Sequence, residues 1–130
     1  MNSYLIDTHV LLWYIEGNPI LSSKIILLLD DPTNTVYVSK VSLWEITIKI
    51  SIGKLSINIP FETLEDFLEE KDFIPLEFDI SDLTVLKNLP FHHSDPFDRL
   101  IISQAINNDF CLISDDSKFA PYSVQLIEAK

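Results

Sequence analysis

The sequence contains little glycine, cysteine or arginine: its 130 residues include two glycines, one cysteine and one arginine. Two glycines are too few for a glycine-rich phosphate loop, which excludes Walker-type and dinucleotide-binding sites. We interpret the single cysteine, Cys111, as a buried strand residue in a reducing compartment, because it lies between Phe110 and Leu112.

Long hydrophobic runs are also missing. The longest, such as IILLL at residues 25–29, are far too short to cross a bilayer. The N-terminus leads directly into a strand-like segment without a basic region, so no signal peptide is predicted. We therefore expect a cytoplasmic protein without membrane association. With 47% hydrophobic residues, residues 1–130 are expected to form one domain with a well-packed core.

Positive charge is scarce, since 9 lysines and arginines face 20 aspartates and glutamates, for a net charge of -11. This balance argues against a protein that holds nucleic acid through a broad basic surface. It does not exclude a nuclease. Many of the acidic residues lie between Glu62 and Asp82, where the simplest interpretation is that they form a solvated helical face and its flanks.

Hydrophobic periodicity predicts strands that alternate with helices along the whole chain. The predicted strands are 3–7, 35–39, 73–78, 110–114 and 123–127. The predicted helices are 10–15, 22–29, 41–52, 61–70, 81–86 and one that begins at residue 96. This alternation favours an α/β fold with a mainly parallel sheet covered on both faces. In such sheets a site forms beyond the carboxyl ends of the strands.

The segment DPFDRLIISQAI at residues 95–106 begins the last predicted helix. Asp95 is a suitable N-cap, and Pro96 fits the first turn because its missing N–H needs no partner there. Asp98 is the third helical residue and shares a face with Ile102 and Ala105, which should point inward. A carboxylate at the edge of a buried face needs a partner.

Further carboxylates are expected at the same edge of the sheet. Asp7 ends the first strand, Asp115 and Asp116 follow the strand at 110–114, and Glu45 lies in a polar stripe with Lys49. Each also has a simpler interpretation. Asp7 could cap the first helix, Glu45 could form a solvated i,i+4 pair with Lys49, and Asp116 could be a turn residue.

Taken together, these acids indicate a cation site. Two carboxylates about 4 Å apart repel each other by roughly 4 kcal/mol at an effective dielectric constant of 20, so several in one cleft require a cation. Oxygen ligands of this kind suit Mg²⁺ or Mn²⁺. Such ions can activate a water for attack on a phosphodiester.

Four segments resemble the successive motifs of the PIN-domain family, specifically of VapC-type toxins from toxin-antitoxin pairs. They are YLIDTHVLLWYI at 4–15, VSLWEITIKISIGKL at 41–55, DPFDRLIISQA at 95–105 and LISDDSKF at 112–119. The resemblance implies a three-layer α/β/α sandwich and a metal-dependent endoribonuclease that cleaves RNA by metal-activated water. It also implies inhibition by a cognate antitoxin, and a homodimer.

The resemblance also implies roles for individual residues. Asp7 and Asp98 match the main metal ligands, while Glu45 and Asp116 match supporting ones, with the adjacent Asp115 as the alternative fourth acid. Two hydroxyl residues are expected to hydrogen-bond the ligands or a phosphate: Thr8 and Ser114.

Few cations are available near this edge to bind RNA. Arg99 and Lys49 are candidate phosphate contacts, although Arg99 could instead pair with an acid such as Asp95. The acidic surface would suit a basic antitoxin segment. Trp13 and Trp44 are expected to be core or dimer contacts rather than platforms for bases.

Three other interpretations were compared with the nuclease. A phosphoacceptor receiver domain needs paired acids after its first strand, but only Asp7 stands there, and its acceptor position after TVYVS holds Lys40. A zinc site at His92 and His93 is disfavoured because adjacent histidines point in different directions. A catalytically silent PIN-like protein that binds an antitoxin or acts as a scaffold stays open as the alternative function.

Overall fold

The computed structural model describes residues 2–115 and 119–130. Its centre is a parallel sheet of five strands in the order β3-β2-β1-β4-β5. The strands are β1 (Ser3–Ile6), β2 (Thr35–Ser39), β3 (Phe73–Leu76), β4 (Cys111–Ser114) and β5 (Leu126–Glu128).

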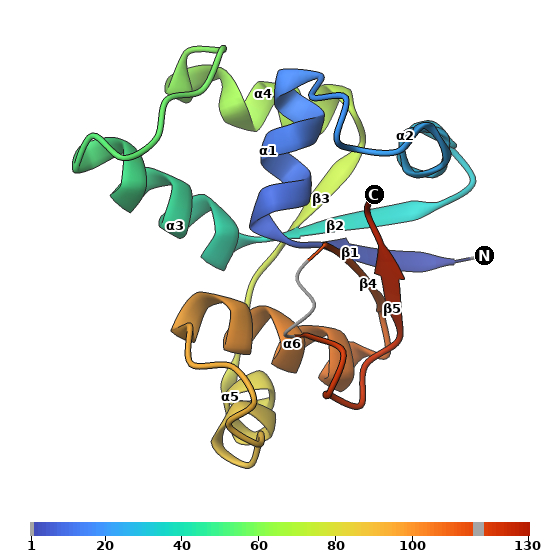
Figure 1. The fold of residues 1–130 in the computed structure, drawn as a ribbon, viewed down its shortest axis with the longest axis vertical. Helices are drawn as coiled ribbons and strands as arrows, with labels where there is room; N and C mark the ends of the chain where they lie inside the picture. The colour runs from blue at the N-terminus through green and yellow to red at the C-terminus, as the bar shows by residue number, and fades with distance from the viewer. Residues whose placement is uncertain (1, 116–118) are drawn as a thin grey trace.

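Helices cover both faces of this sheet, as Figure 1 shows. One layer contains α1 (Thr8–Glu16), α2 (Ser23–Asp30), α3 (Lys40–Ser51) and, after the short 3-10 helix η1 (Phe61–Thr63), α4 (Leu64–Glu70). The other layer contains α5 (Ile80–Lys87) and α6 (Pro96–Asn108). The predicted three-layer α/β/α sandwich with a parallel sheet is therefore confirmed.

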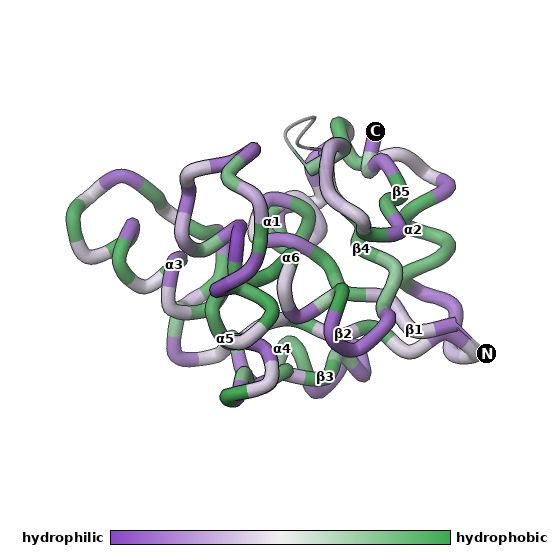
Figure 2. The backbone as a smooth tube through the Cα atoms, turned by 90° about the horizontal axis from the view of Figure 1, so that it is seen from below, coloured by the Kyte–Doolittle hydropathy of each residue, from purple (hydrophilic) through white to green (hydrophobic). Residues whose placement is uncertain are grey.

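Two hydrophobic cores lie on opposite faces of the sheet, because side chains alternate along each strand. In β1, Ile6 packs with α1, α2 and α4, whereas Leu5 packs with Ile101 and Ile102 of α6. Figure 2 shows hydrophobic and hydrophilic residues alternating along the helices, as expected for helices that bury one face. No helix of the described residues is long and apolar enough to cross a membrane.

Capping side chains fix the places where the helices begin. Asp7 accepts a hydrogen bond from the backbone of α1, Ser39 from that of α3, and Asp95 from that of α6. Gly17 ends α1 in the left-handed conformation with φ 64°, where glycine avoids the strain of a Cβ. α6 begins at the predicted residue, whereas α3 begins one residue and α1 two residues before the predicted start.

Some boundaries differ from the prediction. The strand predicted at 73–78 ends at Leu76, because its partner β2 ends at Ser39, opposite Leu76, and Asp79 caps α5. The strand predicted at 123–127 is β5, which begins pairing with β4 only at Leu126.

Cys111, predicted to be buried, is only half-buried because it begins β4. Its partial burial raises the pKa of its thiol, which keeps the thiol protonated and a poor nucleophile.

Candidate functional site

Asp7 lies at the carboxyl end of β1, where its side chain is buried with 2% exposed. One carboxylate oxygen accepts the Val10 N–H at 2.8 Å, so the predicted cap of α1 is present. The other accepts a hydrogen bond from the Ser114 hydroxyl at the end of β4. β1 and β4 are neighbouring parallel strands, as the placement of these acids required. Asp7 therefore caps α1 and also joins the ends of β1 and β4.

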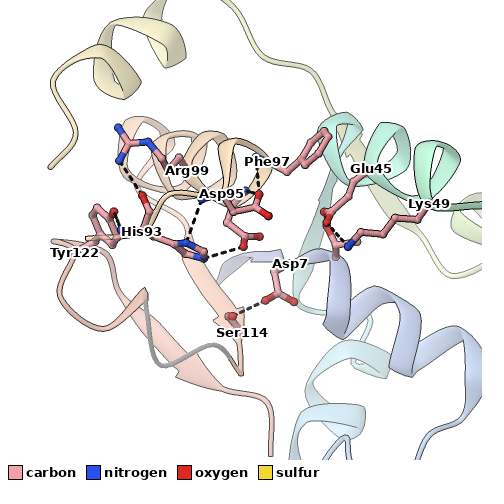
Figure 3. Close-up of polar contacts among 11 residues, drawn as sticks. Asp7, Glu45, Lys49, His93, Asp95, Phe97, Arg99, Ser114 and Tyr122 are labelled. Carbon is pink, nitrogen blue, oxygen red and sulfur yellow. Dashed lines mark hydrogen bonds and ion pairs between the residues drawn. The ribbon is translucent and has the colours of Figure 1, made fainter. Parts of the chain in front are cut away.

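Glu45 approaches the same region from α3 and is 4% exposed. Its Oε1 lies 2.7 Å from the Thr8 hydroxyl, and its Oε2 lies 2.7 Å from the Lys49 ammonium. The i,i+4 pair with Lys49 is thus present, but the carboxylate is buried rather than solvated. Figure 3 shows Asp7, Glu45 and His93 arranged around the N-terminal end of α6.

Asp98 is the third residue of α6, as predicted, and the Ile102 and Ala105 side chains on its face are buried. Its Oδ2 lies 2.9 Å from Nε2 of His93. The sequence indicated that this carboxylate needs a partner, and the structure provides one in the loop before α6.

α3 and α6 meet beside these acids. The Trp44 ring, next to Glu45, contacts the Phe97 ring, next to Asp98, edge to face with 5.2 Å between centroids. This contact brings the two helices together where their carboxylates lie. Trp44 is 59% exposed, so it is not a core residue, because other side chains of α3 form its buried face. The other expected role of Trp44, a dimer contact, stays a prediction. Trp13 packs against the core as expected.

The described carboxylates do not form a compact metal-binding group. Among residues 2–115 and 119–130, no three His, Cys, Asp or Glu side chains form a group that could hold a metal. Asp116, the predicted fourth acid, lies outside the described residues. Asp115 lies with its carboxylate 2.8 Å from the Lys130 ammonium. Asp7, Glu45 and Asp98 still offer buried or half-buried carboxylate oxygens at one edge, and this donor chemistry suits Mg²⁺ or Mn²⁺.

Arg99 does not have the position expected for a phosphate contact. It is 6% exposed, and its guanidinium donates to the carbonyls of Leu89, Pro90 and His93 at 3.1, 2.9 and 3.3 Å. It also lies over the Phe91 ring at 3.9 Å. The predicted phosphate contact and the predicted pair with an acid such as Asp95 are therefore both wrong. The guanidinium instead donates hydrogen bonds to loop carbonyls, because its five N–H donors can satisfy several buried acceptors at once.

Sequence reasoning missed His93 as a member of this site. Its side chain is buried, and its backbone N–H donates to the Tyr122 hydroxyl at 2.7 Å. The only signal was its place two residues before the Asp95 cap. That spacing alone does not fix where an imidazole in a loop points.

Known proteins share the fold of this chain. The sequence matches the PIN domain family over residues 4–124. VapBC2 from Rickettsia felis, crystallised with a DNA fragment from its promoter, is 20% identical with a TM-score of 0.76, over 98% of this chain and 99% of that chain. A toxin-antitoxin complex from Klebsiella pneumoniae is 16% identical with a TM-score of 0.69, over 98% of each chain. FitAcB from Neisseria gonorrhoeae is 16% identical with a TM-score of 0.62, over 95% and 96%. No curated protein matches.

Proposed function

The chain belongs to the PIN domain family, and we propose that it is a Mg²⁺- or Mn²⁺-dependent endoribonuclease that acts as a VapC-type toxin. PIN domains are generally nucleases. The observation that carries the proposal is the buried Asp7 carboxylate, which Ser114 holds at the junction of β1 and β4. A buried carboxylate is costly unless it is paired or binds a cation.

Asp7 and Asp98 are the proposed main ligands, with Glu45 and Asp116 as supporting ligands. When bound, the ion activates a water and neutralises the charge that develops on the phosphodiester. Thr8 and Lys49 fix the Glu45 carboxylate, since each lies 2.7 Å from one of its oxygens. These two residues therefore hold one carboxylate of the proposed donor set in place.

An acidic protein can bind RNA at such a site because a divalent ion reverses the local charge. Lys49 is the remaining candidate phosphate contact, since its side chain is 41% exposed while its ammonium touches Glu45. We expect the ion and a few cations of this kind to supply most of the RNA affinity.

Cleavage of a folded cellular RNA pool tests the function. The purified, antitoxin-free protein is incubated with Mg²⁺, Mn²⁺ or EDTA beside the variants Asp7→Asn and Asp98→Asn. Asparagine keeps the cap at Asp7 and the shape at both positions. We expect cleavage with either metal, and its loss in EDTA and in both variants. Cleavage that persists in EDTA or in both variants would refute the metal mechanism.

The partners proposed for this toxin are a cognate antitoxin and a second copy of the chain, in the cytoplasm. Two of the similar structures are VapBC2 and a toxin-antitoxin complex, and the net charge of -11 suits a basic partner segment. Leu27 of α2, 72% exposed, offers apolar surface on the first helices for a homodimer. Co-expression with the protein encoded beside it should give a stable complex that does not cleave RNA, and light scattering of the free toxin should give the mass of a dimer.

A catalytically silent PIN protein that only binds its partner is the second candidate. It is favoured by the lack, within the described residues, of a group of three metal-ligating side chains. Folded, antitoxin-free protein that binds the partner but neither cleaves RNA nor binds Mn²⁺ would support this candidate over the nuclease.

A further inference from the structure

The loop before α6 holds His93 by its backbone. The His93 N–H donates to the Tyr122 hydroxyl at 2.7 Å, and its carbonyl accepts from Arg99 Nη1 at 3.3 Å (Figure 3). Arg99 also holds the carbonyls of Leu89 and Pro90. Since Arg99 directly follows Asp98 in α6, the helix that carries the acid also fixes the loop that carries the histidine.

The imidazole itself is oriented by the helix cap. His93 Nδ1 accepts the Asp95 N–H at 3.3 Å, and the Phe119 ring packs against it with 5.6 Å between centroids. A nitrogen that accepts a hydrogen bond carries no proton, so the neutral ring carries its proton on Nε2. Nε2 faces Asp98 Oδ2 at 2.9 Å.

We propose that His93 is a positioning residue that holds the Asp98 carboxylate for a divalent cation. The contact engages Oδ2 of Asp98 and so orients this carboxylate. Groups that orient a metal ligand in this way commonly change metal affinity by about 10–100-fold when they are removed. This inference rests on the proposed metal-dependent function, and it adds a residue for which the sequence motifs gave no role.

Direct titration of MnCl₂ into the antitoxin-free full chain, followed by calorimetry, tests the proposal without using activity. His93→Asn keeps an acceptor near the Nδ1 position for the Asp95 N–H but is too short to reach Asp98. His93→Gln extends an amide donor toward Asp98. His92→Asn is the matched control, because the neighbouring His92 is exposed and contacts the Tyr122 ring edge to face.

We expect His93→Asn to raise the Kd for Mn²⁺ by about 10-fold or more. His93→Gln should recover most of the affinity, and His92→Asn should bind as the wild type does. In an Asp98→Asn background, His93→Asn should cause no further loss, because its effect passes through Asp98. Circular dichroism confirms that each variant is folded before it is titrated.

Unchanged Mn²⁺ affinity in folded His93→Asn would overturn the proposal, as would an equal loss in His92→Asn. An equal loss in His93→Asn and His93→Gln would also overturn it, because a general packing defect would then explain the result. If the wild-type protein itself binds no Mn²⁺, the proposed metal-dependent function fails, which is a different outcome from a failure of the role of His93.

Discussion

The Ser114 hydroxyl donates a hydrogen bond to the Asp7 carboxylate and so joins the ends of β4 and β1. The same carboxylate caps α1 through the Val10 N–H. The Asp7 side chain therefore has a structural role as a helix cap and a proposed role as a metal ligand. Different substitutions of Asp7 can separate these two roles.

Asp7→Asn should leave stability nearly unchanged, whereas Asp7→Ala should lower the free energy of unfolding by about 1 kcal/mol or more. Asparagine caps a helix about as well as aspartate, but alanine does not. Urea denaturation of both variants measures the difference. Equal destabilisation by both would contradict the capping role, and Mn²⁺ affinity should fall in both because the carboxylate is absent from each.

Arg99→Met should destabilise the fold by about 3 kcal/mol, because the carbonyls of Leu89, Pro90 and His93 lose their buried donors. Arg99→Lys should also destabilise it, since one ammonium cannot reproduce the planar donor set. Thermal unfolding measures both changes, with the exposed Lys87→Met as the control. If Arg99→Met is as stable as the wild type, Arg99 does not stabilise the fold through these carbonyls.

Thr8→Val should lower the free energy of unfolding by about 1–2 kcal/mol. The buried Thr8 hydroxyl lies 2.7 Å from Glu45 Oε1 and 2.9 Å from Ser42 Oγ, so valine fills the space but removes the link from α1 to α3. Thr8→Ser, which keeps the hydroxyl, is the control. If Thr8→Val unfolds at the same urea concentration as Thr8→Ser, the hydroxyl does not hold Glu45.

Stability should fall at alkaline pH because of Tyr14. Burial, and the hydrogen bond and charge of Asp30, raise the pKa of Tyr14 above its usual 10.0. The unfolded chain then loses this proton first, so the contribution of Tyr14 is complete below pH 10 and declines above it. Unfolding of wild type and Tyr14→Phe between pH 8 and about 11 measures the effect. An identical pH profile in the two proteins would show that Tyr14 does not contribute.

The sequence predicted the sheet edge well because the relevant signals are local. Asp7 directly follows a buried strand, and the Asp95–Pro96 pair marks a helix start. Once β1 and β4 are neighbours, Asp7 and Ser114 must lie close to each other, since parallel strands end at one edge.

His93 and Arg99 could not be placed in the same way. The position of His93 depends on the hydroxyl of Tyr122, 29 residues later in the chain, and on a guanidinium that turns inward. Charged side chains are mostly exposed, so a buried Arg99 contradicts the usual expectation. A core position for Trp44 was wrong for the converse reason, because large aromatic residues are usually buried and this one is largely exposed.

A crystal structure grown with MnCl₂ and measured at the manganese absorption edge tests the central claim most directly. We predict an anomalous peak for an ion bound by carboxylate oxygens of Asp7 and Asp98. Glu45 should contact this ion directly or accept a hydrogen bond from a water bound to it. Because Mn²⁺ takes oxygen ligands readily, a Mg²⁺ site at this edge of the sheet should also bind Mn²⁺. No peak at this edge under saturating Mn²⁺, or a peak held by other residues alone, would contradict the proposed metal site.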